Sequence, residues 1–316
     1  MIRAALGALL VLVWCAATAQ ESDALDVLPG AGVGIDFIGT RDSDHFVRRR
    51  TRVVSVLDYT SPYQFAGVAA GTEYFKQNDW STHGYSLTGI FEERDRATGA
   101  GIAASIGLVH VDGHDRGVAD AVVNHRFSAQ TTGELILQRD FVATRAALDA
   151  GVTHAFVAAS VDHTFSDRWT GILLAGGQHF SDSNDRAHLR GWLIYSLLPE
   201  YGVSLQARVR AYESSRPGGP LYFNPERYET ADFGVRLRRS IGDWRVFGLL
   251  AAGEERIDRT TTNPTHFAQL NADRVLSGDI RAGVRYAYSR AAGESTGSAS
   301  HGYTWHYLRF FIVAPL

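Results

Sequence analysis

Residues 203–238 read VSLQARVRAYESSRPGGPLYFNPERYETADFGVRLR, and this stretch decides the fold. Apolar and polar residues alternate in 203–211 and again in 232–238, so each segment is predicted to be a β-strand with two different faces. One face is apolar, and the other carries two pairs of arginines, Arg208 with Arg210 and Arg236 with Arg238. The charged face fits water. The apolar face requires either a second sheet or lipid.

The same alternation recurs along the whole chain. Fourteen further strands are predicted at about 32–41, 46–59, 66–74, 85–92, 101–108, 117–127, 132–141, 154–165, 169–180, 187–197, 244–255, 266–275, 280–289 and 302–313. Four basic residues, Arg48, Arg49, Arg50 and Arg52, crowd the start of the second strand. Because such charges are costly against lipid at mid-depth, we expect this cluster at a rim.

The lengths of the links between the strands indicate whether the apolar faces pack on a second sheet or on lipid. In the second half of the chain, short and long links are predicted to alternate. The short ones are 165–169, 198–201, 240–243 and 276–279, and the long ones are 142–153, 181–186, 214–228, 256–265 and 290–301. Outer-membrane barrels have short periplasmic turns and longer outer loops, whereas a Greek-key sandwich gives no reason for alternation. The sequence therefore predicts an all-β, transmembrane antiparallel barrel of about sixteen strands, with the last strand closing against the first.

The start of the chain has the features of a secretory signal. Arg3 precedes an apolar run from Ala4 to Trp14, and Ala17-Thr18-Ala19 precedes Gln20. We interpret 1–19 as a signal peptide and 20–316 as the barrel, because the apolar run is too short for a membrane anchor. The only cysteine, Cys15, lies inside the signal. The expected location is the outer membrane of a Gram-negative bacterium, in contact with membrane lipid and lipopolysaccharide.

Three segments carry a family resemblance. They are Arg139-Asp140-Phe141-Val142 with the following ALDAGV of 147–152, then FSDSNDR of 180–186, then YFNPER of 222–227. In order and spacing they resemble the C-terminal barrel of the poly-β-1,6-N-acetylglucosamine export porins, and more weakly the barrel of the cellulose-export subunit. The resemblance covers the chain from about Leu135 onward. It implies a sixteen-stranded pore for an exopolysaccharide. The family's tetratricopeptide domain is missing, so either a separate periplasmic helical-repeat partner does its work, or this barrel carries a different cargo.

The candidate site has two parts. The lumen set holds residues on the polar strand faces: Arg208, Arg210, Arg236, Arg238, Arg281, Arg285, Arg309, Asp232, Asp273 and Glu134, with Asp162 and Glu73 as further carboxylates. These charges either neutralise one another in a lattice or form an eyelet that selects solutes by sign and size. The loop set holds the family motifs: Asp140, Asp182, Asn184, Arg186, Tyr222, Phe223, Asn224, Pro225 and Arg227. These residues either fold the loops into the barrel mouth or contact the polymer.

Other chemistries have weaker support. The formal net charge of -3 gives no indication of a nucleic-acid partner, and no cofactor motif is present. A lipid hydrolase would need a serine beside a histidine, but Ser160 and His163 are predicted on opposite strand faces, as are His125 and Ser128. His110 and His114 lie with Asp112 and Asp115 in a segment that is either a loose metal site or a solvated turn. We expect no enzyme and no metal. An exopolysaccharide pore is favoured, with a general diffusion porin or a plugged structural or receptor barrel as alternatives.

Overall fold

A computed structural model describes residues 30–316 except 62, 96, 260, 277–278 and 293–302, so the predicted signal peptide lies outside the described residues. The strands are β1 (Gly30–Asp42), β2 (Phe46–Ser61), β3 (Gln64–Gln77), β4 (Trp80–Arg94), β5 (Gly101–Val111), β6 (His114–Arg126), β7 (Thr131–Phe141), β8 (Thr153–Thr164), β9 (Trp169–Phe180), β10 (Asp185–Leu198), β11 (Val203–Ser214), β12 (Arg227–Ile241), β13 (Trp244–Ile257), β14 (Thr261–Val275), β15 (Arg281–Arg290) and β16 (Trp305–Pro315). Two short helical segments, α2 (Arg145–Asp149) and η1 (Pro199–Tyr201), lie in the links.

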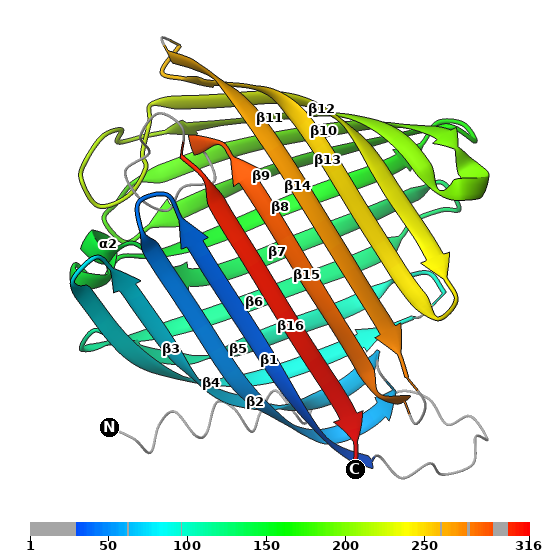
Figure 1. Ribbon diagram of the computed structural model, residues 1–316, viewed down its shortest axis with the longest axis horizontal. Helices are drawn as coiled ribbons and strands as arrows, with labels where there is room; N and C mark the ends of the chain where they lie inside the picture. Colours follow the sequence, from blue (N-terminus) through cyan, green and yellow to red (C-terminus); the bar gives the residue numbers. More distant parts are fainter. Residues whose placement is uncertain (1–29, 62, 96, 260, 277–278, 293–302) are drawn as a thin grey trace.

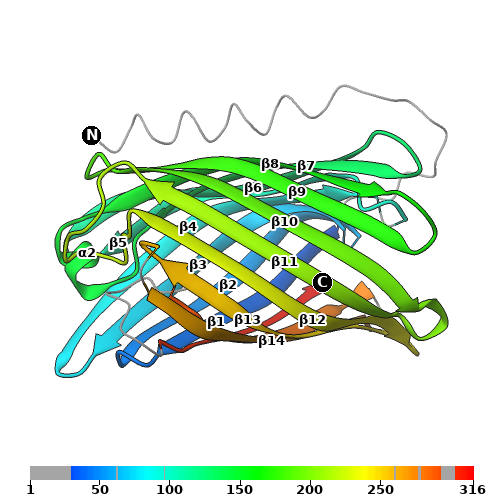
Figure 2. The ribbon, with the colours of Figure 1, turned by 90° about the horizontal axis from the view of Figure 1, so that it is seen from above.

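The strands form one closed barrel (Figures 1 and 2). Each strand pairs antiparallel with its neighbours in sequence, and β1 closes on β16 from Gly32 opposite Pro315 to Asp42 opposite Trp305. Closure gives every strand a partner on both sides, so no sheet edge is left to face hydrocarbon. The prediction of a sixteen-stranded antiparallel barrel is confirmed, including the pairing of the last strand with the first.

The outer face of the wall is apolar because alternate residues of each strand point outward. Large exposed side chains on this face include Leu87, Leu108, Val157, Leu173, Val209, Phe233, Leu250, Leu270 and Phe310. So much exposed apolar surface is unfavourable in water and matches the lipid-facing band of an outer-membrane barrel. The prediction that the apolar face meets lipid, and not a second sheet, is confirmed.

Aromatic side chains mark one end of this apolar band. Phe127, Phe165, Trp169, Tyr201 and Trp244 are exposed and lie in or beside the links that follow even-numbered strands. Two of these rings lie close against the wall: a Cβ added at Gly133 would come within 2.5 Å of the Phe127 ring, and one at Gly171 within 2.7 Å of the Phe165 ring. Such rings form the girdle at a membrane interface. We call this the turn end of the barrel.

The longest links lie at the opposite end, which we call the loop end. They are 142–152, 215–226 and 291–304, and each follows an odd-numbered strand. By the usual asymmetry of outer-membrane barrels the loop end is extracellular, and the turn end, where β16 finishes, is periplasmic. The predicted alternation of link lengths was wrong at two places. The β9–β10 link is only 181–184, and the link predicted at 256–265 shrinks to 258–260 because β13 and β14 extend into it.

The longest fully described helix-bearing link is 142–152, which holds α2. Thr144 caps the helix, since its hydroxyl accepts a hydrogen bond from the Ala147 amide at 3.0 Å. After the helix the chain turns back, so that the Val152 amide donates a hydrogen bond to the Ala147 carbonyl at 2.9 Å. Among the described residues, no helix has the length and the apolar character to cross a membrane.

Candidate functional site

The inner faces of the strands surround two neighbouring cavities. The larger, about 840 Å³, is lined mainly by β1–β7 together with β15 and β16, and the smaller, about 600 Å³, lies against β9–β16. Both are lined by Arg285, Trp305 and Tyr307, so the two cavities meet at the last two strands. Their linings differ in how the charged side chains are paired.

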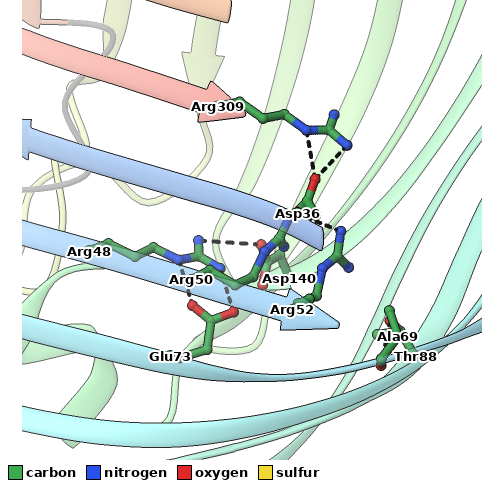
Figure 3. Close-up of polar contacts among 9 residues, drawn as sticks. All are labelled: Asp36, Arg48, Arg50, Arg52, Ala69, Glu73, Thr88, Asp140 and Arg309. Atoms are coloured by element: carbon green, nitrogen blue, oxygen red, sulfur yellow. Dashed lines mark hydrogen bonds and ion pairs between the residues drawn. The ribbon is translucent and has the colours of Figure 1, made fainter. Parts of the chain in front are cut away.

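One wall of the larger cavity is built around a buried carboxylate (Figure 3). Asp36 of β1 is only 3% exposed and is contacted by three guanidinium groups. The Nη2 atoms of Arg50 and Arg52 lie 3.4 and 3.1 Å from its Oδ1 atom, and Nε of Arg309 lies 2.9 Å from Oδ2. Register explains the gathering, because Asp36 lies opposite Arg52 on β2 and opposite Phe311, two residues from Arg309, on β16.

A second carboxylate extends this cluster toward the loop end. Glu73 of β3 is 1% exposed and accepts from Nε of Arg48 at 3.0 Å and from Nη2 at 3.4 Å. Nη1 of Arg48 also lies 3.8 Å from Oδ2 of Asp140 on β7, on a different part of the barrel wall (Figure 3). We call Asp36, Arg48, Arg50, Arg52, Glu73 and Arg309 the ion-paired wall.

The lipid contact that led us to expect the arginine cluster of β2 at a rim is absent for three of its members. Arg48, Arg50 and Arg52 line the larger cavity, while Arg49 points outward, with its guanidinium 6.0 Å from the ring of Tyr74. Alternation sends every second residue into the lumen, where charge meets water and carboxylates and not lipid. Of these four arginines, only Arg49 therefore faces the side of the wall where contact with lipid would be costly.

The smaller cavity has a different lining. Five arginines from β10, β11, β12 and β15 face it, with Asp232 as the only acidic side chain among its described lining residues. Arg208 lies 3.2 Å from Asp232 and 4.5 Å from the centre of the Phe267 ring. Arg236 and Arg285 lie over Phe247 and Tyr307 at 5.6 and 5.7 Å. We call Arg190, Arg208, Arg210, Arg236, Arg285, Phe247, Phe267 and Tyr307 the arginine–aromatic wall.

The loop end is narrowed by α2, which packs against the inner wall. Leu148 is fully buried in a cluster with Phe46, Phe75 and Phe141. The guanidinium of Arg116, itself buried, donates to the Leu148 carbonyl at 2.8 Å and to the Val111 carbonyl at 2.7 Å. A charge-assisted hydrogen bond thus holds the Leu148 carbonyl in the last turn of α2, while apolar contacts hold the Leu148 side chain.

The second and third resemblance motifs meet each other at the same end. Nδ2 of Asn184 donates to the Tyr222 hydroxyl at 3.2 Å and to Oδ1 of Asn224 at 2.9 Å. The Tyr222 hydroxyl donates to Asp182 at 2.9 Å, and its ring stacks on Phe180 with centroids 4.7 Å apart. These contacts agree with the interpretation that the motifs fold loops into the mouth. Contact of the motifs with a polymer stays a prediction.

Arg186 fastens this loop to β10. Its Nη2 donates to the Phe223 carbonyl and to Oδ1 of Asn224, the latter at 3.2 Å, and its guanidinium lies over the rings of Phe180 and Tyr222. The loop also touches the α2 link, because the Thr144 hydroxyl donates to the Leu221 carbonyl at 2.5 Å. Burial raises the pKa of Tyr222 to about 12, so its hydroxyl stays a donor at ordinary pH.

The remaining predicted residues lie outside these clusters. Arg281 lines the larger cavity and lies 3.5 Å from Glu92. Asp273 accepts from Nε of Arg245 at 3.0 Å near the turn end. The others are placed by strand register and burial: Arg238 on the inner face beyond Arg236, Glu134 opposite Ser160, Arg227 bonded to Glu229, and Pro225 buried beside Asn224.

Sequence reasoning missed several lining residues. Asp36 and Arg190 were not predicted, and neither were the rings of Phe247, Phe267 and Tyr307. Position in the alternation was the available signal, since each of them shares a face with a predicted lumen residue of its own or a neighbouring strand. That signal was applied to charged residues in well-patterned strands and not to aromatic ones.

The enzyme and metal candidates do not gather into sites. Ser160 lies on the inner face opposite Glu134, whereas His163 bonds the Thr131 hydroxyl at 2.9 Å on the outer face, as alternation predicted. His110 contacts Asp115 at 2.8 Å on the exposed β5–β6 hairpin. Among the described residues, no three His, Cys, Asp or Glu side chains are placed to hold a metal ion.

A closed sixteen-stranded wall, an outer apolar band and a charged lumen define the class: this chain is an outer-membrane β-barrel. Comparison with protein-family models gave no match, and neither did comparison with curated proteins. Among solved structures, the chain is similar to a bacterial polysaccharide outer membrane secretin, with a TM-score of 0.61 and 17% identity over 92% of this chain and 100% of that one. It also matches OprD of Pseudomonas aeruginosa, with a TM-score of 0.43 and 11% identity over 94% and 97% of the two chains. At these identities the likeness concerns the fold.

Proposed function

We propose that the barrel is a passive pore through which an exopolysaccharide crosses the outer membrane. The observation that carries the proposal is the lumen: two adjoining cavities of about 840 and 600 Å³, lined by charged and aromatic side chains inside a closed barrel. Rings of charged side chains in a pore select what passes by sign and size. The solved barrel with the TM-score of 0.61 is described as a polysaccharide secretin, which supports this cargo class.

The ends of the barrel suit transport in one direction. The resemblance motifs lie at the loop end, where the cargo would leave the lumen, and short turns at the other end leave room for a periplasmic helical-repeat partner to deliver it. Such a partner would act as the tetratricopeptide domain acts in the resembling family. No catalytic step is needed, because a pore works by geometry and charge.

A barrel with a closed mouth is the second candidate. It is favoured by the buried contacts that hold α2 and the 215–226 loop at the loop end, among them Leu148 in its cluster and Tyr222 on Phe180. Loops held this way leave less space for a polymer than a bare mouth. This candidate predicts a barrel that conducts only when a partner or ligand displaces a loop.

Single-channel recording separates the two. The mature protein is refolded, inserted into a planar bilayer and recorded before and after neutral, acidic and cationic oligosaccharides are added. A pore gives steady conductance that at least one oligosaccharide interrupts. A protein that migrates as a folded barrel on gels yet never conducts would overturn the passive pore and favour the closed mouth.

A further inference from the structure

The charge of the smaller cavity opposes the charge of the whole chain. The protein carries a formal net charge of -3. Among its described lining residues, the cavity nevertheless has five arginines, Arg190, Arg208, Arg210, Arg236 and Arg285, and one acidic side chain, Asp232. Positive charge is therefore concentrated where a passing molecule would meet it. A charge of one sign at a constriction favours counter-ions and excludes ions of the same sign.

The way these arginines are held leaves their charge available. Arg236 and Arg285 lie over Phe247 and Tyr307, and neither has a carboxylate within 4.0 Å among the described residues. A ring face orients a guanidinium by a cation–π contact without cancelling its charge. An oriented guanidinium presents a fork of N–H donors that matches a carboxylate.

The same cavity offers flat apolar surfaces. Trp192, Trp305 and Phe247 line it between the arginines. An aromatic ring presents a large apolar face, which suits the C–H face of a pyranose ring. Sugar rings with carboxylates at intervals would meet aromatic faces and guanidinium forks in turn. A cationic glycan would instead meet the like charges of Arg236 and Arg285.

We propose that the cargo is an acidic polysaccharide, whose carboxylates pair in passing with the arginine–aromatic wall. This inference rests on the proposed pore function and names its substrate class. Many weak contacts suit a conduit, since a polymer that is bound tightly at one place would not move on.

The test compares three hexasaccharides of different charge: hexagalacturonate, cellohexaose and the hexamer of chitosan. Half-blocking concentrations come from single-channel current. Direct binding comes from tryptophan fluorescence of the folded protein, because Trp192 and Trp305 line the cavity. The variant is the double substitution Arg236→Gln with Arg285→Gln. The control is Arg239→Gln, which removes one charge from an exposed side chain over Tyr201, at the turn end and outside the lumen.

We expect hexagalacturonate to block the wild-type pore at the lowest concentration. Loss of the two guanidinium groups should raise its half-blocking concentration and its fluorescence dissociation constant by about tenfold or more, because hydrogen bonds between charged groups are the strong ones. Arg239→Gln should leave both within about twofold of the wild type, since screened exposed charges contribute little.

Two results would overturn the inference. One is equal or tighter binding of cellohexaose or the chitosan hexamer by the wild-type protein, and the other is unchanged hexagalacturonate binding in the double variant. The outcome separates this inference from the pore itself. If the barrel conducts but shows no preference for the acidic glycan, the acidic substrate class is rejected and the pore function is kept. A silent barrel that still binds hexagalacturonate through Arg236 and Arg285 rejects the conduit and keeps the acidic-glycan site.

Discussion

Two walls of one lumen use arginine in opposite ways. In the ion-paired wall the guanidinium groups of Arg50, Arg52 and Arg309 converge on Asp36, and Arg48 binds Glu73. In the arginine–aromatic wall Arg236 and Arg285 lie over rings. In the first arrangement the charges pair with one another and hold four neighbouring strands together. The second keeps charge facing the cavity. The partner of an arginine, carboxylate or ring, therefore distinguishes a structural role from a proposed binding role.

Each of the two packed loops is also supported by an arginine, one from the ion-paired wall and one from outside both walls. Arg48 of the ion-paired wall lies 4.6 Å from the centre of the Phe141 ring, which belongs to the cluster around Leu148 of α2. At the loop end of β9–β11, Arg186 supports the loop that carries Tyr222. The comparison therefore extends from the lumen to the mouth, and four substitutions can break or sharpen it.

The largest effect is expected from Asp36→Ala. Removing this carboxylate leaves three guanidinium groups facing one another, and breaking a buried ion pair from one side costs about 3–5 kcal/mol of unfolding free energy. Urea unfolding in lipid vesicles, followed by circular dichroism, measures the loss. Asp58→Ala, at an exposed carboxylate on the same barrel, is the control. A loss below about 1 kcal/mol would mean that lumen water screens this wall as it screens a protein surface.

Leu148→Ala should have the next largest effect, confined to the α2 link. The side chain is fully buried, and deleting a buried leucine costs about 2–5 kcal/mol. We expect faster tryptic cleavage after Arg145 in membrane-embedded protein and a larger single-channel conductance, because α2 no longer packs on the wall. Asp149→Ala, at an exposed side chain of the same helix, should change neither. Unchanged conductance in Leu148→Ala would place α2 outside the conduction path.

Tyr222→Phe tests the other loop and should cost about 1 kcal/mol, since the hydroxyl gives one hydrogen bond to Asp182 and accepts one from Asn184. The pKa of Tyr222 is raised from 10.0 to about 12 by burial, so the folded loop favours the protonated phenol. Its stabilising contribution is complete below pH 10 and is lost as the pH rises through 12. Tyrosinate absorbance should show a step near pH 12 that is smaller by one tyrosine in Tyr222→Phe. A wild-type protein without that step would contradict the closed loop.

The smallest effect is expected from Arg236→Gln. The Phe247 ring orients the Arg236 guanidinium without an ion pair. The free energy of unfolding of the variant should therefore stay within about 0.5 kcal/mol of the wild type, as for a surface substitution. The same urea titration measures it beside Asp36→Ala. A loss above about 1 kcal/mol would make this arginine structural and remove the distinction between the two walls.

The strands were predictable because a barrel in lipid imposes the same alternation on every strand. The failures have local causes. Asn263 and Pro264 lie within the link predicted at 256–265, yet both belong to β14. There β14 extends beyond the first residue paired with β15, His266, so it has one partner only, and such an edge tolerates a proline. The helix α2 spans five residues, too few for a helical period to be visible.

The site was predictable only where alternation was regular. Arg208, Arg236 and Arg285 were placed in the lumen because they lie in well-patterned strands. Asp36 was missed because Gly32 and Gly34 leave the first strand without side chains that would reveal its inner face. Contacts across the barrel, such as Arg48 with Asp140 at 3.8 Å, depend on closure and strand tilt, which no local pattern encodes.

The ion pair between Asp36 and Arg309 joins the two ends of the barrel chain. The two residues are 273 positions apart in the sequence, on strands that touch only when the sheet has closed on itself. The pairing of β1 with β2 is enough to bring Arg50 and Arg52 to Asp36, whereas Arg309 reaches it only when β1 pairs with β16. Formation of the Asp36–Arg309 ion pair therefore reports that the barrel has closed.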